Sequence, residues 1–206
     1  AILISTSGER IFSGNEAHRH MPNQDISGPS RHRALGILGL ALLLPALLAL
    51  IVFPTPMYDT RELIAWGREF PIVTPFHPPM MVWIGGIIDR FFGTSAFVMI
   101  LAGQFLIAIG LIYFYRTLLL VTTRDNALLF TFLYGTSFYT VFAPLSFALN
   151  ADILQLTSWP AIIFHVLRAE QSNRLSHWLA FGVWSAIAVL TKYNAVVLFV
   201  GMASGI

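Results

Sequence analysis

Long apolar stretches alternate with short charged segments along most of this chain. The runs without any charged residue cover 34–58, 91–115, 126–151, 153–167, 175–191 and 193–206. The first three exceed the roughly 20 apolar residues that a helix needs to cross the hydrocarbon core of a bilayer. The pattern therefore predicts an all-α fold, a polytopic transmembrane helix bundle of five spans and the beginning of a sixth.

Composition strengthens this prediction. Hydrophobic residues make up 56% of the chain and charged residues only 11%, whereas soluble domains carry about 25% charged residues. This excludes an ordinary soluble domain, and we expect a lipid bilayer and no nucleic acid as partner. The absence of cysteine excludes disulfides and thiolate metal sites.

The polar residues 1–33 predict a flexible cytoplasmic tail, and the remainder, 34–206, is predicted to be the N-terminal part of a longer multi-span domain. A first span at 34–53 with its N-terminus inside places eight of the twelve basic residues in the cytoplasm. Because Lys and Arg collect on the cytoplasmic side, this orientation is favoured. It places residues 54–90 and the neighbourhood of residue 150 outside.

The first outer loop has a pattern of its own. Residues 59–70 predict a short amphipathic helix with Leu63, Trp66 and Phe70 on one side. After a Pro-rich turn, residues 80–88 predict a second helix. Both are expected to lie at the membrane interface.

With this topology, several polar residues from separate segments meet at the outer face. The candidate site residues are Asp59, Arg61, Glu62, His77, Asn150, Asp152 and Lys192. Lys192 is the only lysine, and an ionisable group between two apolar runs is a functional candidate. Each residue also has a structural interpretation: Asp59 and Glu62 as a capping box, Asn150 or Asp152 as an N-cap, and Lys192 reaching to the head groups.

The order of these residues is similar to that of a known family. The resemblance is to the polyprenyl-phosphate-dependent glycosyltransferases of the C-type (GT-C) fold, which include protein O-mannosyltransferases and lipid A aminoarabinose transferases. The segments that carry it are Asp59-Thr-Arg-Glu62, Phe76-His77-Pro78-Pro79, Asn150-Ala-Asp152, Leu154-Gln155-Leu156, Trp159-Pro160 and Leu190-Thr191-Lys192-Tyr193.

The resemblance implies transfer of a sugar from a polyprenyl-phosphate carrier to a glycan, lipid or protein acceptor outside a bacterial inner membrane. Asp59 would then be the catalytic base, since an attacking hydroxyl must lose its proton. Lys192, Arg61 and His77 would stabilise the leaving phosphate. Many members carry adjacent Asp-Glu in this loop, whereas here the second acid is Glu62. Some relatives bind a divalent metal, but no sure ligand set is present, so no metal site is predicted.

Two other classes of protein stay open at this point. A transporter or channel would line a substrate path with intramembrane charges, but here the charges lie at the predicted span ends. A structural subunit would have little need for Asp59, Asp152 and Lys192 at one face.

Overall fold

The computed structural model describes residues 47–48, 51, 55, 58–74, 78–137, 140 and 149–205. All of them belong to the second of the two units, 1–36 and 37–206, into which the chain divides. The helices are α2 (Tyr58–Gly67), α3 (Met80–Phe92), α4 (Ala96–Val121), α5 (Arg124–Gly135), α7 (Ala151–Ser172), α8 (Leu175–Thr191) and α9 (Ala195–Gly205). These described ranges contain no strand, so the all-α class is confirmed for them. The predicted tail, most of the span at 34–53 and His77 lie outside these ranges.

One described helix, α4, is long and apolar enough to cross a membrane by its length and composition. The pattern predicted it at 91–115, but it begins later because residues 91 and 92 finish α3. Gly93 then adopts a left-handed φ of 78°, and the Ser95 side chain caps α4 by accepting from Val98 N at 3.1 Å. Helices α8 and α9 are apolar but shorter. A multi-span bundle therefore stays a prediction.

No single helix extends over the predicted span 126–151, of which residues 138–139 and 141–148 lie outside the described part of the chain. Helix α5 has only 12 residues and ends at Gly135, a length of about 18 Å, which is far less than the roughly 30 Å of a hydrocarbon core. Hydroxyl groups bond the carbonyls at the end of this helix. The Thr140 hydroxyl lies 2.8 Å from Tyr134 O and 2.9 Å from Gly135 O. Such side-chain bonds to the backbone compete with helix continuation, and hydropathy does not register them.

The two short helices of the predicted outer loop are present, with different ends. Helix α2 stops at Gly67, three residues before the predicted end, and Phe70 has a left-handed φ of 48° outside the helix. Phe70 therefore does not extend the apolar face of α2. Helix α3 continues beyond the predicted residue 88 to Phe92. Their location at a membrane interface stays a prediction.

Close approach of backbones holds neighbouring helices together. A Cβ atom on Gly86 of α3 would collide with Gly67 O at the end of α2. Helices α4 and α7 meet in the same way, because a Cβ on Gly110 would collide with Leu156 O. Pro160 has no N–H to bond the carbonyl four residues earlier, so Leu156 O is the carbonyl that the helix itself leaves unpaired. Gly110 gives this carbonyl room against α4.

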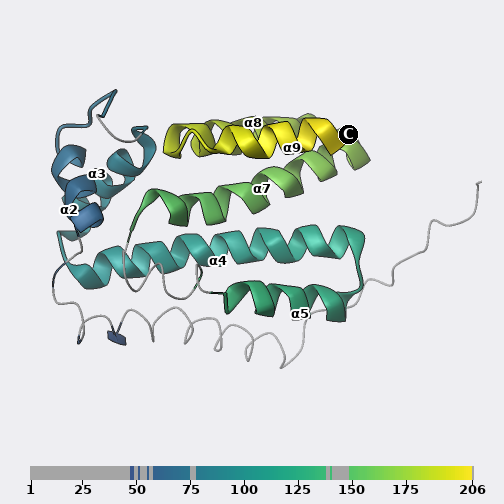
Figure 1. Cartoon of the computed structure of the whole chain (residues 1–206), viewed down its shortest axis with the longest axis horizontal. Coiled ribbons are helices and arrows are strands. Elements are labelled where there is room, and N and C mark those ends of the chain that lie inside the picture. Colours follow the sequence, from purple (N-terminus) through teal and green to yellow (C-terminus); the bar gives the residue numbers. More distant parts are fainter. Residues whose placement is uncertain are drawn as a thin grey trace, which may run out of the picture. The chain divides into compact units, whose positions relative to one another are not determined.

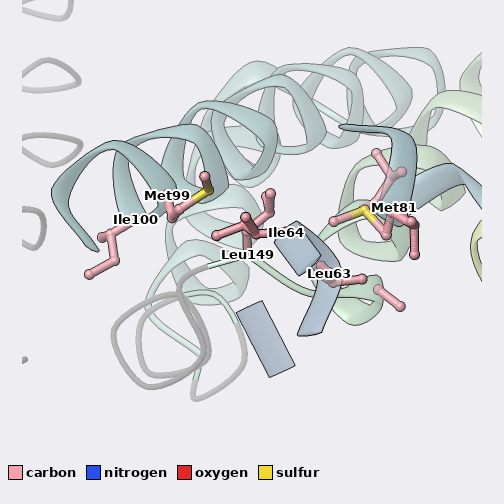
Figure 2. Packing of buried hydrophobic residues seen from close by; sticks show 9 residues of the cluster. Leu63, Ile64, Met81, Met99, Ile100 and Leu149 are labelled. Atoms are coloured by element: carbon pink, nitrogen blue, oxygen red, sulfur yellow. The ribbon is translucent and has the colours of Figure 1, made fainter. Parts of the chain in front are cut away.

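The main apolar core joins the short helices to the long ones. Figure 1 shows α2 and α3 at one end of α4 and α7, with α5 beside α4. In Figure 2, Leu63 and Ile64 of α2 lie close to Met81 of α3, to Met99 and Ile100 of α4 and to Leu149. This core packs against the first turns of α2 and α7. Those two turns carry most of the candidate site residues.

Candidate functional site

A pocket lies where α2 and α7 begin and where α8 has just ended. It encloses about 550 Å³, including the space that is open to solvent. Its lining residues are Asp59, Glu62, Leu63, Trp66, Thr74, Val82, Asn150, Ala151, Asp152 and Lys192. Five of the seven candidates from the sequence are among them, although they come from segments up to 133 positions apart in the chain. Their expected proximity is confirmed, whereas their chemical roles are not tested by it.

Helix α2 supplies the first acidic wall. Asp59 lies in its first turn, where the positive end of the helix dipole stabilises a carboxylate. Glu62 follows three positions later and Trp66 four after that, so all three side chains share one helical face. Because α2 already begins at Tyr58, Asp59 lies inside the helix rather than at its N-cap.

The start of α7 supplies the second wall. The Asn150 side chain is the N-cap and accepts a hydrogen bond from Ile153 N at 3.1 Å. The structural interpretation of Asn150 is therefore correct, although this residue lines the pocket as well. Asp152 lies in the first turn, and its Oδ1 accepts from Lys192 Nζ at 2.6 Å. Lys192 ends α8 as its C-cap residue, so this ion pair joins α7 to the end of α8.

The pocket combines three carboxylates with one ammonium group. An ammonium carries three N–H donors, and the bond to Asp152 uses one of them. The Lys192 and Asp152 side chains are 37% and 45% exposed, so a ligand entering the pocket can reach both. Such a half-exposed pair contributes little to stability. The position of the pair at the pocket wall therefore says more about ligand binding than about stability.

Two predicted residues do not join this group. Arg61 is exposed on α2 and does not line the pocket, because it falls between Asp59 and Glu62 on a different helical face. His77 lies outside the described residues. In the described part of the chain, no three His, Asp or Glu side chains come together in a way that could hold a metal ion.

The pocket also contains residues that the sequence reasoning missed. Thr74 comes from the connection after α2, and Val82 from α3. Nothing in the local pattern marks either residue, because their position depends on how the loop folds back. The sequence pattern places Leu63 and Trp66 only on the apolar face of a surface helix. Their spacing from Asp59 and Glu62 was a signal that they share one wall.

A second polar cluster lies farther along the long helices and shares no residue with the pocket. His165 Nδ1 of α7 and His177 Nδ1 of α8 are 3.1 Å apart, and His165 Nε2 is 3.4 Å from the Tyr113 hydroxyl of α4. The Arg116 guanidinium lies 4.7 Å from the centre of the Phe164 ring. This cluster links three helices about 13 residues, or roughly 20 Å, away from Asp152 along α7.

Comparison with known proteins decides the family. The model of the dolichyl-phosphate-mannose-protein mannosyltransferase family matches residues 76–204, more than half of the chain. The chain belongs to this family. The resemblance to GT-C glycosyltransferases is thereby confirmed. No curated protein and no solved structure matches the chain.

Membership establishes a membrane glycosyltransferase that uses a lipid-linked sugar. Asn150, Asp152 and Lys192 lie inside the matched region, whereas Asp59 and Glu62 precede it. The assignment of these two acids to the site therefore depends on the pocket geometry and not on the family match.

Proposed function

We propose that this mannosyltransferase relative transfers a sugar from a polyprenyl phosphate to an acceptor hydroxyl in the pocket between α2 and α7, on the outer face of a bacterial inner membrane. The observation that carries the proposal is the meeting of Asp59 and Glu62 with Asp152 and Lys192 around one cavity. A glycosyl transfer of this kind needs both a base and a cation. The pocket contains both, at its two walls.

Asp59 acts as the base in this proposal. Its carboxylate takes the proton of the acceptor hydroxyl while the hydroxyl oxygen bonds to the anomeric carbon. The bond between that carbon and the phosphate oxygen breaks, and its electron pair leaves with the polyprenyl phosphate. Asp59 is exposed at the pocket wall, which suits a group that must meet an incoming acceptor. Glu62, on the same helical face and lining the same pocket, binds hydroxyls of the sugar in this proposal.

Lys192 stabilises the leaving phosphate. Fixed positive charge that faces developing negative charge lowers the barrier to group transfer. Asp152 holds the ammonium at 2.6 Å and so fixes its direction, while the remaining N–H groups bind phosphate oxygens. Since carboxylates outnumber cations in the pocket, we expect the phosphate to bind on the Lys192 side and the acceptor on the Asp59 side.

An apolar groove between α3 and α4 suits the prenyl chain of the donor. It encloses about 800 Å³ including open space, and its lining residues are Ile88, Phe92, Val98, Leu101, Ala102 and Phe105. All six are apolar. A prenyl chain is a long hydrocarbon, and a donor whose phosphate lies in the pocket needs an apolar surface for this chain.

The decisive test is Asp59→Asn in the full-length protein. The amide cannot accept the proton, so transfer from radiolabelled polyprenyl-phosphate mannose in membranes should fall by about a hundredfold to ten-thousandfold. Loss of the charge from the first turn of α2 should lower stability by only about 0.3–1 kcal/mol. Asp125→Asn, the same change in the first turn of α5 and away from the pocket, is the matched control and should keep its activity. Near-normal turnover of Asp59→Asn would move the role of base to Glu62 or Asp152.

The groove has its own test, Ala102→Trp. The indole would fill the groove, so the KM for the polyprenyl donor should rise several-fold or more, while thermal unfolding changes little. Ala186→Trp places the same side chain on an exposed face of α8 and should leave KM unchanged. Equal KM values for the two variants would exclude the groove as the prenyl site.

A further inference from the structure

Thr60 makes a long-range contact that joins the two walls of the pocket. Its side chain is fully buried, with 0% exposure, although both of its neighbours, Asp59 and Arg61, are exposed. The hydroxyl donates to Leu149 O at 3.1 Å and accepts from Leu149 N at 3.3 Å. The two residues are 89 positions apart in the chain.

These two hydrogen bonds satisfy both backbone groups of Leu149. This residue is itself fully buried, and a buried N–H or C=O group without a partner is costly. No regular helix provides for Leu149, since α7 begins only at Ala151. The Thr60 hydroxyl on α2 therefore supplies both backbone hydrogen bonds of Leu149, which within α7 would come from neighbouring turns of the helix.

The position of Thr60 matters because candidate site residues adjoin both ends of the contact. Thr60 directly follows Asp59 and lies two residues before Glu62, while Leu149 directly precedes the capping residue Asn150 and lies three before Asp152. A shift of the contact therefore changes the separation of the two carboxylate walls. A misplacement of about 1 Å in a reacting group can lower a rate by about a hundredfold.

We propose that Thr60 is a positioning residue that sets the spacing between the α2 wall and the α7 wall of the pocket. This inference rests on the proposed function for its kinetic consequence, but its structural part can be measured without any activity. The important group is the hydroxyl. The methyl group contributes packing only.

The test compares Thr60→Val, which removes the hydroxyl and keeps the shape, with Thr60→Ser, which keeps the hydroxyl. The matched control is Thr157→Val, which removes another fully buried threonine hydroxyl. This hydroxyl donates to Leu106 O with a hydrogen-bond length of 2.7 Å, and Thr157 does not line the pocket. Should Thr60→Val not fold, Thr60→Ala removes the same hydroxyl and takes its place.

The structural readout is a distance between spin labels in the full-length protein. Tyr58→Cys at the start of α2 and Gln171→Cys near the end of α7 are both exposed, and the sequence given has no native cysteine. We expect one narrow distance distribution with Thr60, with Thr60→Ser and with Thr157→Val, and a broadened or shifted one with Thr60→Val. An unchanged distribution in Thr60→Val would overturn the inference.

The kinetic readout uses radiolabelled polyprenyl-phosphate mannose in membranes. With Thr60→Val, kcat should fall by about ten- to a hundredfold while the KM for the donor changes little; Thr60→Ser should stay within about twofold of the wild type. An equal loss of kcat in Thr157→Val or in Thr60→Ser would show a general packing effect and contradict the inference. If the wild type transfers no sugar but the label distances respond as expected, the proposed function fails and the positioning role stands.

Discussion

Asp89 shows how a single side chain connects the end of α2 to the end of α3. Its Oδ2 accepts from Arg68 Nε at 3.0 Å, and its Oδ1 accepts from the Thr94 hydroxyl. The hydrogen bond from Thr94, followed by that from Arg68, lowers the pKa of Asp89 below its ordinary value. The Asp89 side chain is only 12% exposed, whereas that of Arg68 is 65% exposed. The link therefore joins an exposed cation to a largely buried carboxylate.

The lowered pKa predicts an acid-dependent contribution to stability. Because the ionised form is favoured in the folded protein, the contribution is complete above the unfolded pKa of about 3.9 and is lost as the pH falls through the lower folded value. Asp89→Asn should lower the free energy of unfolding at pH 7 by about 1 kcal/mol or less, since Arg68 is exposed. Thermal unfolding in detergent between pH 7 and pH 3 should show the difference from the wild type closing in acid. A difference that is constant with pH would contradict this assignment.

At the scale of elements, contacts between glycines and backbone decide how closely the helices approach. The pair α2–α3 meets at Gly67 and Gly86, and the pair α4–α7 meets at Gly110. Small residues at such contacts are typical of helices packed in membranes, where van der Waals contact drives association. The α2–α3 contact matters for function because α2 supplies Asp59 and Glu62, and any displacement of α2 moves the acidic wall.

Gly86→Ala should therefore destabilise the protein by about 1–3 kcal/mol, because the added methyl group collides with the backbone of Gly67 and not with a side chain that can turn away. Gly182→Ala in α8 is the matched control. A Cβ there meets nothing within 4 Å, so this change should be neutral or stabilise by up to about 1 kcal/mol through helix propensity. Thermal unfolding of both variants measures this. Equal melting temperatures would show that the helices can separate without loss.

At the scale of the whole molecule, α4 is the described helix that is long and apolar enough to cross a membrane. The residues before it include Val73, and those after it include Thr123, both exposed. Between these positions, α3 has 13 residues, too few to cross a bilayer. We therefore expect one span between Val73 and Thr123, whatever the topology of the rest of the chain.

This predicts that single cysteines at the two positions lie on opposite faces. Val73→Cys should react with a membrane-impermeant thiol reagent in intact cells, whereas Thr123→Cys should react only after the membrane is opened, since the positive-inside rule favours that side for Arg116 and Arg124. The sequence given has no thiol of its own to interfere. Reaction of both variants in intact cells would contradict α4 as a span, and the reverse pattern would invert the orientation.

The sequence by itself determined the helical class, the two short helices after residue 58, the apolar helices and the family. The helical class and the helices follow from local composition and periodicity, which do not depend on distant partners, whereas the family follows from the order of the polar motifs and from the family match. It also named Asp59, Glu62, Asn150, Asp152 and Lys192, because polar and ionisable groups beside apolar runs are conspicuous. The helix ends were harder to predict. Hydroxyl bonds from Thr140 accompany the end of α5 at Gly135, and the left-handed Gly93 accompanies the end of α3.

Only the tertiary structure decided which of these residues share a pocket and what holds them there. Arg61 is charged and lies in the same loop as Asp59 and Glu62, yet its helical face excludes it from the lining. Thr60 carries no conspicuous signal, because a threonine gains its role only when a distant backbone needs its hydroxyl. The pairing of Lys192 with Asp152 depends on the packing of α7 against α8. Local sequence determines which groups are present, whereas long-range packing determines which of them meet.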